Sequence, residues 1–264
     1  DRLLELTRSQ GWKGLHHVGL ENALITAVAC AEGDLRFLFS FDLGEAESSL
    51  FAGLGALGAV LNGCQLFTVP CRKDLQTVER ILSPACSGLV VPPAIEIKPV
   101  QQSDVVESRV GAWGVHGRES GLPTVLKLAP SADRELLLLG GYEAAEMYEF
   151  STAMDHHDWS EKIDRPGHLS EEECLGRLLR CGRAVFPLQT SAQAVFPLKA
   201  LLAGARVLVS DVNLMSDVDG LQTVKADWEE RLFEQWTPPR EGWEAHFSPA
   251  QVKRRWQEAY QRCT

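Results

Sequence analysis

The 264-residue sequence has no uninterrupted apolar run near the roughly 18 residues that a membrane-spanning helix needs, so no span is expected. It also lacks an excess of basic residues, because 26 Lys and Arg stand against 36 Asp and Glu, for a formal net charge of -10. An acidic surface repels phosphate backbones, so we expect no nucleic-acid partner. The chain begins at Asp1 without the basic and apolar segments of a secretory signal. We expect a cytoplasmic protein, because the seven cysteines described next are interpreted as reduced thiols, and peripheral association with a membrane is left open.

No Cys-x-x-Cys pair occurs, and no His stands at a zinc-binding offset from a pair of cysteines. The sequence nevertheless contains seven cysteines, an odd number. Cys174 and Cys181 lie seven residues apart in a helical pattern, on one face with neighbouring leucines. We expect reduced, buried cysteines that pack as small hydrophobic side chains, with a disulfide or a bound metal as the alternatives.

What the sequence does contain is typical of folded domains: 45% of the residues are hydrophobic and 23% are charged. From about residue 108 onward, short apolar segments alternate with segments of helical periodicity. This alternation predicts a parallel sheet covered by helices on both faces. The predicted strands are 109–115, 134–139, 161–165, 183–188 and 205–210, and the predicted helices are 122–129, 142–154, one that begins after Ser170, and 197–203.

The helix after Ser170 carries clear signals at both ends. Ser170 and Glu173 have the spacing of a capping box, and three consecutive Glu residues stand at the positive end of the helix dipole. Gly182 is expected to end this helix.

The first hundred residues repeat the α/β pattern more loosely. We expect a first, truncated Rossmann-like domain over 1–98, a second over 108–236, and a C-terminal helical segment over 237–264 that crosses back toward the first domain. Ser248 is the predicted N-cap of the last helix, whose apolar stripe includes Val252 and Trp256. The predicted elements of the first domain are strands 14–18, 36–41, 65–69 and 89–91 and helices 21–31, 47–63 and 74–82.

The segment Gly53–Gly58 matches the G-x-G-x-x-G pattern of dinucleotide-binding turns. Such a turn must follow a strand directly, whereas about ten residues of helical pattern precede Gly53. We therefore interpret these glycines as small residues that let helices pack closely. A nicotinamide-dependent oxidoreductase is kept as an alternative function.

Three further clusters bear chemically useful side chains. His16 and His17 stand at the end of a predicted strand, where parallel sheets bind ligands, although a structural role is open to both. The segment 155–158 (Asp-His-His-Asp) could supply metal ligands, but no third ligand cluster accompanies it, and an exposed loop is favoured. The segment 253–255 (Lys-Arg-Arg) is expected to be a solvated helix face.

The stretch 166–211 contains a series of short motifs, and further motifs stand outside it. Within the stretch they are Gly167-His168-Leu169-Ser170, Val185-Phe186-Pro187, 197–207 (PLKALLAGARV) and Ser210-Asp211, and outside it Val91-Pro92-Pro93, Gly117-Arg118 and Phe247-Ser248. In these motifs the stretch resembles the donor-binding domain of the retaining, nucleotide-sugar-dependent glycosyltransferases of GT-B fold, and the resemblance covers most of the chain. It implies an α/β fold of two Rossmann-type domains with parallel sheets, the N-terminal one truncated.

The resemblance also implies a donor site that departs from the family pattern. Where relatives carry two Glu residues, one for the donor sugar and one for the ribose, this chain has Ser191 and Lys199. The Lys that usually follows the Gly-Arg pair is missing after Arg118, and Phe41-Asp42 stands where relatives have His-Asp. The implied donor-binding residues are Arg118, Gly167, His168, Ser191, Ala192, Gln193 and Lys199, and the candidates on the acceptor side are His16, His17 and Asp42.

The implied activity is transfer of a sugar from a nucleotide-sugar donor to a glycan or other acceptor, with retention and without a metal or other cofactor. Catalysis of such a transfer consists mainly of electrostatic stabilisation of the departing diphosphate by cations and backbone amides. The alternative is a catalytically degenerate relative that keeps the scaffold for sugar binding or protein interaction.

Overall fold

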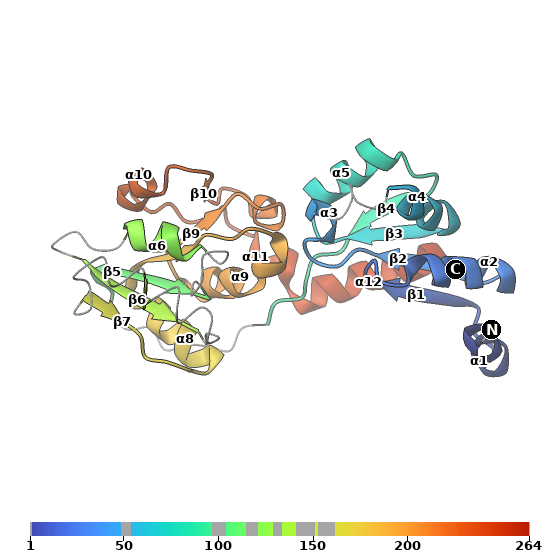
Figure 1. Cartoon of the computed structure of the whole chain (residues 1–264), viewed down its shortest axis with the longest axis horizontal. Coiled ribbons are helices and arrows are strands. Elements are labelled where there is room, and N and C mark those ends of the chain that lie inside the picture. Colours follow the sequence, from blue (N-terminus) through green and yellow to red (C-terminus); the bar gives the residue numbers. More distant parts are fainter. Residues whose placement is uncertain are drawn as a thin grey trace. The chain divides into compact units, whose positions relative to one another are not determined.

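The computed structural model divides the chain into two compact units, which are described separately (Figure 1). Unit 1 comprises Asp1–Ala94, Thr190–Ala192 and Glu244–Thr264, and unit 2 comprises Ile95–Gln189 and Gln193–Trp243. The structure describes residues 2–48, 54–96, 104–114, 121–128, 134–140, 151–152 and 162–263.

Unit 1 contains a four-stranded parallel sheet with the strand order β1-β2-β3-β4. Its strands lie close to the four predicted segments, which confirms them. The strands are β1 (Gly14–Val18), β2 (Arg36–Ser40), β3 (Leu66–Val69) and β4 (Ser87–Val90).

Alternate residues of these strands face two different layers, as the period of two in a strand requires. One face carries Phe37, Phe39 and Phe67, which pack in an aromatic core with three longer helices and with Ala46 of a short one. The opposite face carries Leu38 and Leu66, which pack against the C-terminal helix. Figure 1 shows α4 and α5 on one side of the sheet and α12 on the other. The helices are α2 (Ala23–Gly33), α4 (Leu54–Gly63) and α5 (Arg72–Leu82) for the aromatic core, and α12 (Pro249–Cys263) for the other face.

Helix α12 begins as the sequence predicts. The backbone N–H of Gln251 donates to Ser248 Oγ at 3.3 Å, which makes Ser248 the N-cap. Val252, Ala259 and Cys263 are buried along one stripe, and Trp256 packs against the same cluster. The shorter helices of unit 1 are α1 (Arg2–Gln10), α3 (Glu45–Ser48) and α11 (Glu244–Phe247).

Unit 2 contains a six-stranded parallel sheet with the order β10-β9-β8-β5-β6-β7. Its central strand β5 pairs with β6 and β8. Five strands correspond to predicted segments, and the short edge strand β10 was not predicted. The bounds are β5 (Val106–Trp113), β6 (Glu135–Leu139), β7 (Ile163–Asp164), β8 (Cys181–Phe186), β9 (Val207–Ser210) and β10 (Thr223–Val224).

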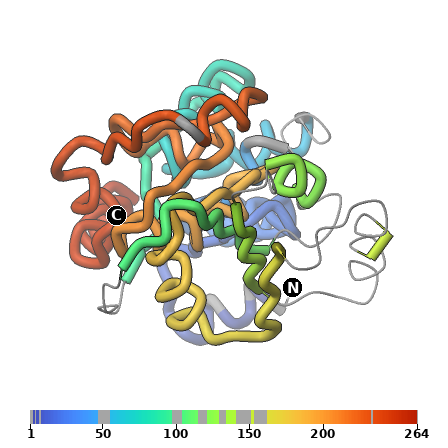
Figure 2. The backbone as a smooth tube through the Cα atoms, turned by 90° about the vertical axis from the view of Figure 1, so that its left-hand side faces the viewer, coloured from blue at the N-terminus to red at the C-terminus, as the bar shows by residue number. Residues whose placement is uncertain are grey.

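Helices cover both faces of this sheet. Helix α6 lies on one face, where it packs with α10 over Val110, Ala112 and Leu138. Helices α8 and α9 cover the opposite face; α8 and α6 appear on opposite sides of the strands in Figures 1 and 2. The bounds are α6 (Leu122–Leu128), α8 (Glu171–Leu178), α9 (Val195–Leu202) and α10 (Trp228–Phe233).

The capping box of α8 is present as predicted: Ser170 Oγ accepts the N–H of Glu173, and the Glu173 carboxylate accepts the N–H of Ser170. The hydrogen bonds that the Glu173 carboxylate accepts from the backbone N–H and the hydroxyl of Ser170 hold the pKa of Glu173 below its usual value. The expectation that Gly182 ends this helix is wrong, because the helix ends at Leu178 and Gly182 is the second residue of β8. A Cβ at this position would lie 2.3 Å from the carbonyl oxygen of Glu107, so glycine permits the close approach of β5 and β8.

The parallel α/β architecture of both units confirms the predicted fold class. Most of the helix predicted over 142–154 lies outside the described residues. Within the described part of the chain, no helix is both long and apolar enough to cross a membrane. The cytoplasmic location stays a prediction.

Candidate functional site

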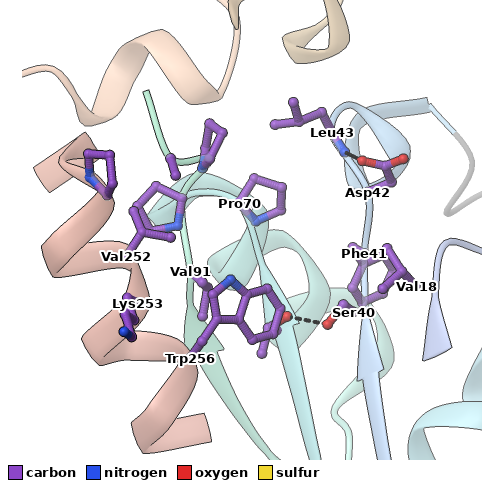
Figure 3. A pocket seen from close by; sticks show the side chains of 15 residues that line it. Val18, Ser40, Phe41, Asp42, Leu43, Pro70, Val91, Val252, Lys253 and Trp256 are labelled. Carbon is purple, nitrogen blue, oxygen red and sulfur yellow. Dashed lines mark hydrogen bonds between the residues drawn. The ribbon is translucent and has the colours of Figure 1, made fainter. Parts of the chain in front are cut away.

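A cavity of about 460 Å³ opens at the carboxyl ends of the strands of unit 1 (Figure 3). Ligands of parallel α/β sheets bind at this edge. Helix α12 forms another wall of the cavity, so residues from both ends of the sequence meet there. The lining includes Val18 at the end of β1, Ser40 at the end of β2, Thr68 and Pro70 at β3, residues 91–94 after β4, and Pro249, Val252, Lys253 and Trp256 of α12.

The walls of the cavity are mainly apolar. Four prolines and the indole of Trp256 supply rigid surfaces, and Figure 3 shows the indole extending from α12 toward Ser40. The lining residues include two charged side chains, Asp42 and Lys253. Such a surface suits a ligand that has both apolar faces and a few polar groups.

Asp42 follows β2 and is held by its own turn. Its Oδ1 accepts the backbone N–H of Leu43 at 2.7 Å, and its backbone N–H donates to Glu45 Oε2 at 2.8 Å. Glu45 Oε1 accepts the N–H of Leu20 at 2.9 Å, so one carboxylate joins the loops after β1 and β2. Glu45 was not predicted, although it stands three residues after Asp42, at the spacing of a capping box. Asp42 itself is exposed, and its carboxylate has further lone pairs for a ligand hydroxyl.

A chain of hydrogen bonds crosses the sheet beside this cavity. Thr68 Oγ1 donates to Ser40 Oγ at 2.7 Å, and Ser40 Oγ lies 2.7 Å from Nε2 of His16. Nδ1 of His16 lies 3.0 Å from the hydroxyl of Tyr260. Since Ser40 accepts from Thr68, its own proton points to Nε2, and we assign the neutral tautomer in which Nδ1–H donates to Tyr260. The four residues join β3, β2, β1 and α12.

His17 has a different environment because adjacent strand residues face opposite ways. Its Nδ1 lies 2.9 Å from Thr26 Oγ1, its Nε2 lies 2.8 Å from the carbonyl oxygen of Glu21, and its ring stacks on Phe39. The two histidines are therefore not a paired site. His17 joins β1 to the aromatic side of unit 1, and neither histidine is among the residues that line the cavity.

The environment of His16 predicts a pH dependence of stability. Burial lowers the pKa of His16, and repulsion from His17 adds to the shift. Between the lowered pKa and the ordinary value near 6.5, the unfolded chain binds more protons than the folded one, so the free energy of unfolding falls as the pH falls. The stability contributed by neutral His16 is complete above pH 6.5 and is lost as the pH drops through the pKa that His16 has in the folded protein.

Urea unfolding at about pH 7.5 and about pH 5.5, two values that bracket the ordinary pKa of histidine, checks this expectation. Replacing His16 with glutamine should reduce the stability lost between the two pH values. An unchanged loss in that variant would show that other groups cause it.

A second cavity, of about 470 Å³, lies at the amino ends of β1 and β2. Lys13, Arg36 and Tyr260 are among its lining residues. Arg36 Nη1 donates to the carbonyl oxygen of Cys263 at 2.7 Å, so this guanidinium serves the last turn of α12. This second cavity and the first cavity therefore lie at opposite edges of the sheet.

The basic segment of α12 is only partly the solvated face that the sequence predicted. Lys253 and Arg254 are exposed. Arg255 is half-buried: its Nη1 donates to the carbonyl oxygen of Val90 at 3.1 Å and its Nη2 lies 3.1 Å from Nδ1 of His246. The prediction is therefore wrong for Arg255, which ties α12 to the end of β4.

In unit 2, the predicted donor-side residues around α8 lie directly before that helix. Gly167 adopts a φ of 80°, a conformation that favours glycine, and His168 is exposed. Both lie between the end of β7 and the N-terminus of α8, at the carboxyl edge of the sheet. Arg118, with Gly117, lies outside the described residues.

The remaining predicted donor-side residues stand around a short 3-10 turn, Ser191–Gln193, and helix α9. Ser191 is fully buried, whereas Ala192 and Gln193 are exposed. Ser191 and Ala192 belong to unit 1, and Gln193 and Lys199 belong to unit 2. Gln193 Oε1 accepts the backbone N–H of Gln189 at 2.8 Å.

Lys199 forms an ion pair with the first residue of α8. Its Nζ donates to the two carboxylate oxygens of Glu171 at 2.9 and 2.7 Å. The Lys199 side chain is 23% exposed and that of Glu171 is 54% exposed, so the pair is open to solvent on one side. The sequence analysis did not single out Glu171, because the two residues are 28 positions apart in different helices.

Two other predicted motifs gain no support from the structure. Gly55 and Gly58 lie inside α4, not in a turn after a strand, and Gly53 is outside the described residues. A Cβ at Gly55 or Gly58 would meet nothing within 4 Å, so close helix packing at these two positions is also wrong. The segment 155–158 lies outside the described residues. Among the residues that are described, no three His, Cys, Asp or Glu side chains form a group that could hold a metal ion.

Comparison with solved structures identifies similar folds over nearly the whole chain. Sucrose-phosphate synthase from Thermosynechococcus elongatus is 16% identical, with a TM-score of 0.72, and the match covers 98% of this chain and 77% of that one. The lipopolysaccharide outer core galactosyltransferase WaaB in its apo form is 8% identical, with a TM-score of 0.75 and coverage of 98% and 78%. Anabaena HepE in complex with UDP is 12% identical, with a TM-score of 0.74 and coverage of 98% and 81%.

The sequence by itself gives no such match, since no family model and no curated protein resembles it at a significant level. The structural similarity nevertheless extends through both parallel sheets and agrees with the resemblance found in the sequence. The chain therefore has the two-domain GT-B fold of these glycosyltransferases.

Proposed function

We propose that the protein is a glycosyltransferase, which transfers a sugar from a nucleotide-sugar donor to a hydroxyl group of a glycan or other acceptor. The observation that carries this proposal is the fold, which is shared over 98% of the chain with a galactosyltransferase and with a protein whose structure contains UDP. The cavity at the carboxyl edge of unit 1 supports it, because it offers a place for an acceptor.

The chemistry of that cavity suits a carbohydrate acceptor. A sugar ring has apolar faces that can lie against Trp256 and the prolines, and hydroxyl groups that can donate to the carboxylate of Asp42. Lys253, on the α12 wall, can donate to a ring or hydroxyl oxygen. We assign Asp42 to acceptor binding. His16 is assigned a positioning role, because its hydrogen bond with Ser40 holds a residue at the same edge of the sheet.

The donor site in this proposal comprises Arg118, Gly167, His168, Ser191, Ala192, Gln193 and Lys199. The backbone amides of the turn Ser191–Gln193 favour negative charge, whereas the N-terminus of α8 already carries Glu171, Glu172 and Glu173. Arg118 supplies a permanent positive charge for the diphosphate leaving group. Retention of configuration and transfer of a hexose follow from the family resemblance, and the nucleotide sugar enters as a substrate, without a metal.

The ion pair of Lys199 and Glu171 provides a test of the donor site, because replacing its two members should change the affinity for UDP in opposite directions. Replacing Glu171 with glutamine frees the ammonium group, so UDP should bind about 3- to 10-fold more tightly. Replacing Lys199 with methionine removes that charge and leaves the carboxylate, so UDP should bind more weakly by a similar factor. Calorimetric titration of the three proteins measures both changes.

The free energy of unfolding of each variant is measured as the control for a purely structural effect of the substitution. Because the pair is partly exposed, each substitution should change the free energy of unfolding by no more than about 1 kcal/mol. If Lys199 serves only to join α8 and α9, both variants will lose a little stability and bind UDP as the native protein does. Equal affinities would therefore remove Lys199 from the donor site.

A second candidate function is a scaffold that binds sugars or a protein partner without catalysis. The observation that favours it is the chemistry of the two positions where the family resemblance implies carboxylates. Ser191 is buried, and the Lys199 ammonium has no lone pair and can only donate, so neither side chain can accept hydrogen bonds from the ribose or sugar of a donor as a carboxylate would. Binding of a glycan without any binding of UDP, GDP or ADP would favour the scaffold over the enzyme.

A further inference from the structure

Two cysteines of unit 1 lie next to each other although they are 22 positions apart. Cys64 stands between α4 and β3, and Cys86 directly precedes β4. Strands β3 and β4 are parallel neighbours, with Leu66 opposite Ser87, so their amino ends bring the two thiols together. The distance between the two Sγ atoms is 3.2 Å.

The two thiols contact the same backbone carbonyl group but differ in burial. Both Sγ atoms lie close to the carbonyl oxygen of Leu61, at 3.3 Å for Cys64 and 3.2 Å for Cys86. Cys64 is buried and Cys86 is half-buried. The contact with the Cys64 thiol lowers the pKa of Cys86, and the same contact raises the pKa of Cys64. Cys86 is thus the more accessible thiol and the first to become a thiolate.

The other five cysteines offer a clear contrast. All of them are buried, and burial favours the thiol form, which is a poor nucleophile. These residues are Cys30, Cys71, Cys174, Cys181 and Cys263.

We propose that Cys64 and Cys86 form a redox-active dithiol, whose co-reactant is a small-molecule disulfide such as oxidised glutathione. In the first step the Cys86 thiolate attacks one sulfur of that disulfide, a mixed disulfide forms, and one glutathione thiolate leaves. In the second step Cys64 loses its proton to solvent and attacks Sγ of Cys86, and the second glutathione leaves. The two cysteines are oxidised by two electrons, and one glutathione disulfide is reduced to two thiols.

The product would link the turn before β3 to the turn before β4, at the end of the sheet opposite to the 460 Å³ cavity. Such a link restricts the unfolded chain over the β3–α5 segment, so the oxidised protein should unfold at a temperature several degrees higher than the reduced one. This inference does not depend on the proposed glycosyl transfer, since it concerns residues outside both candidate binding regions.

The experiment treats the full chain, first reduced and then freed of reductant, with oxidised glutathione under native conditions. The intact mass is determined first, the remaining thiols are then alkylated, and the proteolytic peptides are mapped. We expect the mass of two hydrogens to be lost, a single cross-linked peptide pair that contains Cys64 and Cys86, and full reversal by dithiothreitol. The matched control Cys263→Ser, which removes another unit 1 cysteine, should give the same cross-link.

Single substitutions separate the roles of the two thiols. Cys64→Ser should stop at the mixed disulfide, with one glutathione on Cys86, whereas Cys86→Ser should leave Cys64 unmodified. If a serine variant does not fold, the corresponding alanine variant and the peptide map of the native chain serve instead. A stable glutathione adduct on Cys86 of the native chain, cross-links among other cysteines, or two free thiols at positions 64 and 86 after treatment would each overturn the proposal.

Discussion

Replacing Asp42 with alanine is expected to lower kcat/KM for the acceptor by about 10- to 100-fold, because a hydrogen bond to a charged group contributes about 1.5–3 kcal/mol. Asp42 is one of the residues that line the cavity, and Figure 3 shows its carboxylate beside Leu43, whose backbone N–H donates to Oδ1. The measurement is release of nucleoside diphosphate from the donor as a function of acceptor concentration. The KM for the acceptor should rise, while the Kd for UDP should stay unchanged.

Asp42→Asn is the matched control for this prediction. Asparagine keeps an oxygen that can accept the N–H of Leu43, so the turn is preserved, but it lacks the negative charge. It should therefore show an intermediate loss. If the alanine variant transfers sugar as well as the native protein, Asp42 has no part in acceptor binding.

Replacing Trp256 with alanine should have the largest effect on stability. The indole packs in the cluster of Leu38, Leu66 and Ala259, and its ring lies 5.1 Å from that of His16. Since the side chain is half-buried rather than fully enclosed, we expect a loss of about 2–4 kcal/mol in the free energy of unfolding. The same change removes one wall of the cavity, so the KM for a carbohydrate acceptor should also rise.

Trp12 provides the control for this substitution, because 47% of its surface is exposed. Trp12→Ala should change the free energy of unfolding by no more than about 0.5 kcal/mol. Urea unfolding of both variants compares the two positions directly. A similar effect of the two substitutions would mean that α12 does not rest on the sheet through Trp256.

The secondary structure could be predicted largely from local signals. The apolar segments 36–41 and 134–139 became β2 and β6, and the Ser170–Glu173 capping box marks the start of α8. The prediction for Gly182 was wrong because a glycine after a helical pattern is a common end signal, whereas this glycine allows the backbones of two strands to approach. Only the packing of β5 against β8 distinguishes these two uses of glycine.

The candidate site was predicted less well because its contacts join distant positions. Local spacing gave His16 and His17 as neighbours at one strand end, but the alternation of the strand sends them to opposite faces. Glu45 stands at capping-box spacing from Asp42, but its contact with Leu20 has no local sequence signal, and neither has the pairing of Glu171 with Lys199. The Cys64–Cys86 contact likewise depends on the pairing of β3 with β4.

The central claim is that this chain uses a nucleotide-sugar donor, and the most direct measurement is calorimetric titration of the native protein with UDP, GDP and ADP. Since the positions of two expected carboxylates are occupied by Ser191 and Lys199, we predict weak but saturable binding of one of these diphosphates, with a Kd above the micromolar range and one site per chain. We also predict that the corresponding nucleotide sugar displaces the bound diphosphate. Absence of saturable binding for all three, with a protein that unfolds cooperatively, would contradict the claim.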